Sequence, residues 1–155
     1  MSSRRRKILI ASGVNLDLLG RREPSLYGDA SLRDMENLLK KNIEQSQSLK
    51  SQFKLHFFQS NDEAKFLMEL DRGYAGAVVN AGAWTHTSLA LADRLRGLQL
   101  PFVEAHVSNL KIREPIRQHS YLAEHAICVV QGHGIESYWL GLEALLQFLL
   151  AKESK

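Results

Sequence analysis

Five short apolar runs, separated by longer segments of helical period, constrain the fold of this chain more than any other feature. The runs cover residues 7–12, 53–58, 76–80, 102–106 and 126–131. Several of them lack polar alternation, which is typical of parallel strands buried on both faces. The regular alternation of strand and helix therefore predicts an α/β domain built on a parallel sheet.

The segments between the runs carry helix signals. The sequence Ser31-Leu-Arg-Asp34 resembles a capping box, and Leu32, Met35, Leu39 and Ile43 then fall on one helical stripe. We expect N-caps at Asn61 and Thr87, a helix over 88–96 ended by Gly97, a short helix opened by Pro115, and a last helix over 136–151. The interpretation is a flavodoxin-like three-layer α/β/α fold with a five-stranded parallel sheet of order 2-1-3-4-5.

Length and charge predict one domain with a short basic arm. At 155 residues the chain is the size of a single domain. Residues 4–7, Arg-Arg-Arg-Lys, supply four of its 20 basic residues, so that 16 remain against 17 acidic residues. We expect a basic arm over 1–6, one catalytic domain over 7–151 and a tail over 152–155. A solvated arm is favoured over a nucleic-acid contact.

Membrane and export signals are weak. The apolar run 8–11 is too short for the core of a signal peptide, and the stretch 138–151 contains Glu143 and Gln147 and is too short to span a bilayer. Cys128 is the single cysteine and has no partner within the chain, which favours a reducing compartment. We expect a cytoplasmic protein with no membrane contact.

Polar side chains gather where the predicted strands end, the edge at which ligands bind in open α/β sheets. Asn15 follows the first strand, and Asn80 and His86 follow the third. Glu104 and His106 lie two residues apart on the fourth strand and so share a face. A carboxylate beside an imidazole suits a proton donor. The spacing alone equally fits a core histidine satisfied by a buried acid.

The polar loop between Gly20 and Gly28 carries Arg21, Arg22, Glu23 and Tyr27. Glycines at both ends permit hinge-like movement. A guanidinium close to a phenol favours its ionisation, so an arginine and a tyrosine on a closing lid could form a base once substrate is bound. A simple contact role for the tyrosine also fits.

Other ligands of such folds lack their signals here. The loop after the first strand has few hydroxyl groups for a flavin phosphate, Asn80 stands where a phosphoacceptor domain needs aspartate, and Gly132-His-Gly134 lacks the downstream acid of a dinucleotide site. The six histidines show no metal-binding spacing. Cys128 lies in an apolar run, which is typical of an inert thiol. We predict no organic cofactor and no metal.

Four separated motifs carry a resemblance to a known family: GVNLDLLGRREPSLYG, FFQSNDE, VVNAGAWTHTSLALADRL and PFVEAHVSNLKIREPIRQHSYL. Together they resemble the type II 3-dehydroquinate dehydratases over about residues 7–150. The resemblance implies anti elimination of water from 3-dehydroquinate through an enolate, with no cofactor, giving 3-dehydroshikimate for aromatic amino acid biosynthesis by the shikimate pathway or during quinate breakdown. A non-catalytic paralogue on the same scaffold is the alternative, against which the retained chemical groups argue.

The resemblance also implies a role for each matching residue. Tyr27 matches the base, Arg22 its activating arginine, Asn15 the group that stabilises the enolate, His106 the general acid and Glu104 its orienting carboxylate. The substrate-binding positions are Asn80, His86, Val107, Ser108 and Arg117, while Arg21, Glu23 and Arg113 belong to the lid or to a surrounding layer. Asp93 matches an acid that reaches a neighbouring subunit's site, because the family assembles as trimers grouped into homododecamers.

Overall fold

The sheet has five parallel strands in the order β2-β1-β3-β4-β5, which confirms the predicted topology. The computed structural model describes residues 4–153. The strands are β1 (Arg6–Ser12), β2 (Phe53–Gln59), β3 (Gly76–Asn80), β4 (Phe102–His106) and β5 (Val129–Gln131). β5 begins three residues later than expected, although two backbone hydrogen bonds already join the preceding residues to β4: Ile127 N–H to the carbonyl of Phe102 at 2.8 Å, and Glu104 N–H to the carbonyl of Cys128 at 3.1 Å.

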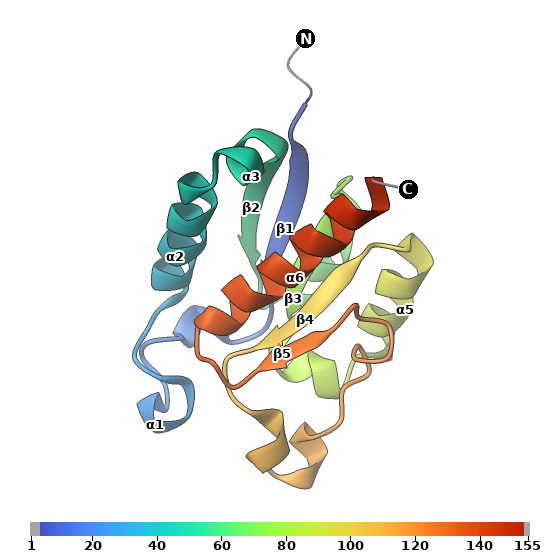
Figure 1. Ribbon diagram of the computed structural model, residues 1–155. Coiled ribbons are helices and arrows are strands. Elements are labelled where there is room, and N and C mark those ends of the chain that lie inside the picture. Colours follow the sequence, from blue (N-terminus) through green and yellow to red (C-terminus); the bar gives the residue numbers. More distant parts are fainter. Residues whose placement is uncertain (1–3, 154–155) are drawn as a thin grey trace.

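Helices cover both faces of this sheet (Figure 1). They are α1 (Pro24–Tyr27), α2 (Leu32–Gln45), α3 (Gln47–Gln52), α4 (Glu63–Glu69), α5 (Leu89–Leu98) and α6 (Glu136–Glu153). Four short 3₁₀ helices lie in the loops: η1 (Leu16–Leu18), η2 (Gly82–His86), η3 (Leu110–Ile112) and η4 (Pro115–Arg117). α1 and α3 lie in segments that the sequence patterns left without structure. Within residues 4–153, no helix is long and apolar enough to cross a membrane.

The side chains on the two faces of β1 belong to two separate apolar clusters. Ile8 and Ile10 pack with side chains of α2 and α6, whereas Leu9 and Ala11 pack with side chains of α4 and α5. All four are essentially inaccessible to solvent, and burial of one such Leu or Ile side chain contributes about 1.5–3 kcal/mol to folding. The sheet is therefore the rigid layer from which the loops at its carboxyl edge are held.

Two predicted helix caps are each one residue from the observed cap. The capping box at Ser31 and Asp34 is confirmed, with both reciprocal hydrogen bonds present. α4 is capped by Asp62 and not by Asn61, whose Oδ1 accepts instead from the backbone N–H of Asn15 at 2.8 Å. α5 is capped by Ser88 and not by Thr87.

The predicted end of α5 is also wrong. The helix continues through Gly97 to Leu98, and Gln99 takes the left-handed conformation with φ of 52°. Apart from the adjoining residues and the backbone of α5 itself, no atom lies within 4 Å of a Cβ placed at Gly97, so this glycine is not required by crowding.

Candidate active site

The loops that follow β1 and β3 approach each other closely at the carboxyl edge of the sheet. Gly13 donates its N–H to the carbonyl of Asn80 at 2.7 Å, and a Cβ at Gly13 would lie 2.5 Å from the carbonyl oxygen of Ala81. At Gly82, where φ is +61°, a Cβ would lie 2.6 Å from the carbonyl oxygen of Val14. Only glycine fits at these two points, and the close approach puts Asn15 and Asn80 on one cavity.

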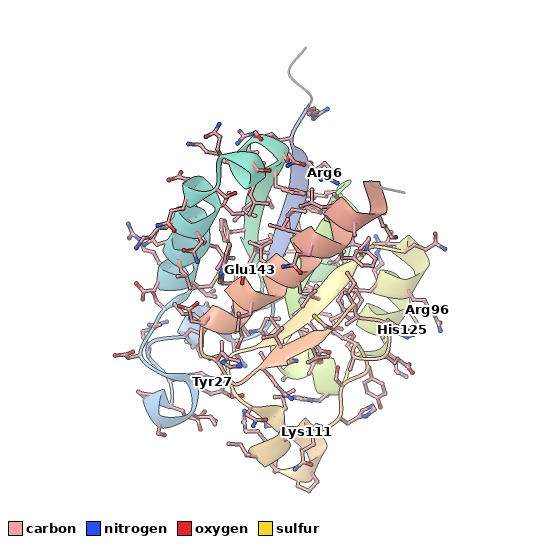
Figure 2. The ribbon with its side chains drawn as sticks, viewed as in Figure 1. Arg6, Tyr27, Arg96, Lys111, His125 and Glu143 are labelled. Atoms are coloured by element: carbon pink, nitrogen blue, oxygen red, sulfur yellow. The ribbon has the colours of Figure 1, made fainter. Side chains whose placement is uncertain are left out.

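A cavity of about 150 Å³ opens between these loops, the lid and the segment after β4. Ten of the residues expected at the site line it, namely Asn15, Arg22, Tyr27, Asn80, His86, His106, Val107, Ser108, Arg113 and Arg117. Leu16, Leu19 and Leu110 add apolar surface that the sequence patterns did not assign. Figure 2 shows Tyr27 and Lys111 towards one end of the molecule and Arg6 at the other.

The Tyr27 hydroxyl lies between two guanidinium groups. Nη2 of Arg22 donates to it at 2.7 Å and Nη1 of Arg113 donates at 3.2 Å. The guanidinium carbon of Arg22 also lies 4.4 Å from the centre of the Tyr27 ring. Two cations that donate to one oxygen stabilise its anionic form relative to the neutral phenol. Arg113, expected only near the lid, thus contacts the tyrosine directly.

Two non-glycine residues beside the cavity have left-handed backbones. Asn15 has φ of 64° and precedes η1, while Glu23 has φ of 37° and precedes α1, the helix that carries Tyr27. Asparagine tolerates this conformation better than glutamate does. Such positions cost about 1–3 kcal/mol each and cluster at functional sites. The hydrogen bond from Asn15 N–H to Asn61 helps to hold the first of them.

Opposite the lid, β4 presents a buried acid and an imidazole. Nε2 of His106 lies 2.6 Å from Oε1 of Glu104, and both side chains are at least 95% buried. Burial alone would raise the pKa of Glu104, but hydrogen bonds from His106, Thr85 and Ser120 outweigh it and hold that pKa below its ordinary value. The carboxylate is therefore ionised, and Nδ1 of His106 is the ring nitrogen left for the cavity.

The second histidine of the cavity is held in one tautomer. Nδ1 of His86 lies 2.7 Å from the carbonyl oxygen of His119, which can only accept, so Nδ1 carries the proton. Burial lowers the pKa of His86, and the positive charges of His106 and Arg117 act in the same direction. His86 is thus a neutral side chain whose Nε2 can accept a hydrogen bond.

Four of the expected site residues do not line the cavity. Glu104 is buried behind His106, with which it pairs at 2.6 Å. Arg21 and Glu23 are exposed on the lid. Asp93 lies on α5, where its side chain is 68% exposed and pairs with Arg96 at 3.0 Å. Within residues 4–153, Asp93 is not among the side chains that line the cavity.

Two hydroxyl groups at the site, those of Thr85 and Ser120, were missed by sequence reasoning. Both contact Glu104, from 19 and 16 residues away along the chain. No periodic pattern links positions in separate loops, so their only sequence signal is membership of the motifs quoted above.

Potential metal ligands are dispersed in the part of the chain that the structure describes. Among residues 4–153, no three His, Cys, Asp or Glu side chains lie close enough together to hold a metal ion.

Comparison with known proteins decides the family. The family model described as dehydroquinase class II matches residues 6–146. The chain belongs to the class II dehydroquinases. It is 42% identical to the 3-dehydroquinate dehydratase of Prochlorococcus marinus subsp. pastoris over 145 residues, which cover 92% of this chain and 96% of the relative. It is 41% identical to a catabolic 3-dehydroquinase of Meyerozyma guilliermondii over 147 residues, 92% of this chain and 99% of that one.

Solved structures of the family share the fold. The type II dehydroquinase of Butyrivibrio crossotus superposes with a TM-score of 0.84 at 28% identity, covering 92% of this chain and 98% of that one. The enzyme of Propionibacterium acnes gives a TM-score of 0.79 at 31% identity, with 94% and 97% covered. The family resemblance of the sequence motifs and the predicted topology are thus both confirmed.

Proposed function

We propose that this class II dehydroquinase converts 3-dehydroquinate to 3-dehydroshikimate and water, and that residues 7–151 form the catalytic domain. Relatives that align over nearly their whole length carry the name 3-dehydroquinate dehydratase. One observation carries the assignment to this chain's own residues. The Tyr27 hydroxyl accepts from two arginines on a cavity whose other wall holds His106 backed by the carboxylate of Glu104.

Tyr27 acts first, as the base. Its phenolate takes a proton from the carbon next to the substrate ketone, and the electron pair of that C–H bond moves towards the ketone oxygen to give an enolate. Asn15, beside the cavity, stabilises the negative oxygen together with a bound water, as the family resemblance implies. Arg22 and Arg113 support this step because they favour the anionic form of the base.

His106 completes the elimination. As the enolate collapses, the C–O bond on the neighbouring carbon breaks and the imidazolium gives its proton to the departing hydroxyl, which leaves as water. Glu104, ionised at 2.6 Å, stabilises the imidazolium before transfer. Proton transfer from the phenol to the imidazole, directly or through solvent, restores both groups.

The remaining polar groups bind the substrate. His86 offers Nε2 as an acceptor for a ring hydroxyl, and Asn80 and Arg117 provide donors on the same wall. Val107 and Ser108 form the turn that holds the substrate carboxylate, and Arg113 donates to the hydroxyl of Ser108 at 3.3 Å.

The direct test is turnover of 3-dehydroquinate by the purified chain, followed as rising ultraviolet absorbance of the conjugated enone. We expect Tyr27→Phe and His106→Ala each to lose most of kcat with an unchanged circular dichroism spectrum. No absorbance rise at saturating substrate, from protein that remains folded, would refute the proposed activity. Near-normal kcat in either variant would refute the role given to that residue.

Assembly into trimers and then a dodecamer is part of the proposal. A groove of about 680 Å³ between α4 and α5 contains Asp93 together with apolar side chains, and Met68 on its rim is 65% exposed. A second copy packed there would cover these groups and could bring Asp93 to a neighbouring cavity. Light scattering that gives the mass of one chain would contradict this assembly.

The proposed setting is cytoplasmic, in biosynthesis or in quinate breakdown. The lone Cys128, a half-buried thiol, supports a reducing compartment. Growth of a strain that lacks its own dehydroquinase, on medium without aromatic amino acids, tests whether the chain can serve biosynthesis.

A further inference from the structure

The carboxylate of Glu104 receives hydrogen bonds from three different parts of the fold. Besides Nε2 of His106 on β4, the hydroxyl of Thr85 in η2 lies 2.5 Å from Oε1. The hydroxyl of Ser120, in the loop after η4, lies 2.8 Å from Oε1 and 2.9 Å from Oε2. Glu104 and Thr85 are fully buried, so no solvent competes for these contacts.

The direction of each hydroxyl proton follows from its other partners. The Ser120 oxygen accepts from the backbone N–H groups of Leu122 at 3.0 Å and Ala123 at 3.1 Å, which together fill its acceptor capacity. Its single proton is left for Glu104. Thr85 and Ser120 are 3.0 Å apart, and since the oxygen of Ser120 is already occupied, the Thr85 proton also points to the carboxylate.

We propose that Thr85 and Ser120 are positioning residues that keep Glu104 ionised and thereby keep His106 in the protonated form that releases water. This inference depends on the proposed dehydratase function. Hydroxyl donors stabilise a carboxylate, whereas a protonated Glu104 would need an acceptor for its proton where three donors already converge. An ionised Glu104 in turn stabilises the imidazolium beside it.

The other charged groups around His106 do not supply this stabilisation. Arg117 of η4 and, from the lid side, Arg22 and Arg113 are positive and oppose the imidazolium, while His86 of η2 is neutral in its observed tautomer. Glu114 pairs with Arg117 at 2.5 Å and with Arg113 at 3.6 Å but does not line the cavity. Neighbouring strands contribute uncharged amides, Asn80 from β3 and Gln131 from β5. Among residues 4–153 no carboxylate lines the cavity, and Glu104, buried behind His106 at 2.6 Å, is the acid that contacts its ring.

Four variants form two matched pairs. Thr85→Val removes one donor at nearly constant volume, and Ser120→Ala removes the other, whereas Thr85→Ser and Ser120→Thr keep a hydroxyl. We expect kcat for 3-dehydroquinate to fall about tenfold in the Val and Ala variants, the loss of one hydrogen bond to a charged group, with KM unchanged. The basic limb of the kcat–pH profile should move to lower pH, and the hydroxyl-retaining variants should restore both properties.

A second measurement needs no substrate. The ring nitrogen-15 shifts of His106, followed by NMR against pH, should show the imidazolium persisting to higher pH in the wild type and Thr85→Ser than in Thr85→Val. Ser46→Ala is the matched control for Ser120→Ala. The hydroxyl of Ser46, like that of Ser120, accepts a hydrogen bond from a backbone N–H, but Ser46 caps α3 at the far end of the molecule (Figure 1). The Ser46→Ala variant should leave the titration of His106 unchanged.

The possible outcomes separate the two proposals. An inactive wild type in which Thr85→Val still shifts the His106 titration would refute the dehydratase function and support the positioning role of Thr85. An active wild type whose Val and Ala variants keep its pH profile, or lose kcat equally at every pH, would overturn the positioning role. If Ser120→Ala fails to fold, Thr85→Val decides alone, since Thr85 caps no turn.

Discussion

Replacing Arg22 with glutamine tests whether the base depends on its guanidinium partners. In the structure Nη2 of Arg22 makes the shorter of the two bonds to the Tyr27 hydroxyl, 2.7 Å against 3.2 Å from Arg113. Glutamine retains an N–H donor on a shorter side chain and removes the charge. Arg22→Gln therefore leaves Tyr27 with one cationic partner in place of two.

The expected magnitude follows from the bond that is lost. A hydrogen bond to a charged group contributes about 1.5–3 kcal/mol, and the guanidinium stacked 4.4 Å from the ring centre adds about 0.5–1 kcal/mol at a partly exposed site. At tenfold per 1.36 kcal/mol, the hydrogen bond alone predicts a fall in kcat of about 10–150-fold. Arg22→Lys should fall in the same range, because a flexible ammonium cannot both donate to the hydroxyl and stack on the ring.

The assay is the initial rate of enone formation against substrate concentration, which separates kcat from KM. Arg33→Gln, on the exposed side of α2, is the matched control and should leave both constants unchanged. If Arg22→Gln raises KM while kcat stays within threefold of the wild type, the arginine binds substrate and does not support the base. That result would refute the electrostatic account of Tyr27.

Three further predictions concern stability. Tyr138→Phe removes a fully buried hydroxyl that is hydrogen-bonded to the hydroxyl of Ser12 at 2.8 Å. The free energy of unfolding, measured in urea, should fall by about 1–3 kcal/mol. An unchanged midpoint urea concentration would contradict this. Glu104→Gln should destabilise the fold more at pH 7 than at pH 4. The folded pKa of Glu104 lies below its ordinary 4.5, so the stability it contributes is present above that value and is lost as pH falls through the folded pKa. An equal loss in urea at both pH values would show that no ionised Glu104 is involved. Gly82→Ala should lower the melting temperature, because the new Cβ would lie 2.6 Å from a carbonyl oxygen and φ is +61°. Gly97→Ala, in the uncrowded part of α5, should instead raise the free energy of unfolding by about 0.5–1 kcal/mol. Equal melting temperatures for the two variants would be evidence against both arguments.

Periodicity was enough to predict the sheet and one half of the site. The i, i+2 relation alone puts Glu104 and His106 on one face of a strand, and the structure adds which ring nitrogen meets the acid. The order of the strands followed from the βα alternation. Both features depend on the periodicity of neighbouring residues and on the alternation of strands and helices, which can be recognised in a single sequence.

The helix caps and the hydroxyl donors depend on contacts between distant segments. Asn61 and Asp62 are both competent caps, and the choice falls to Asp62 because Asn61 is engaged by Asn15 from another loop. Thr85 and Ser120 reach Glu104 only because η2 and the loop after η4 fold over the end of β4. Such pairings have no period, so the sequence could offer no rule to find them.

The two walls of the cavity differ in rigidity in a way that suits an elimination with two proton transfers. The acid wall is part of the sheet, and Glu104 and His106 are almost wholly buried on β4. The base wall is the lid, where Tyr27 ends the single-turn helix α1 between two positive-φ residues, Glu23 and Gly28. Few buried contacts hold such a segment, so it can open at small cost to admit a substrate. Closing it restores the contact from Arg113, which lies outside the lid, to the Tyr27 hydroxyl, whereas Arg22 belongs to the lid itself. The base therefore has both guanidinium partners only when the rigid acid wall already faces it.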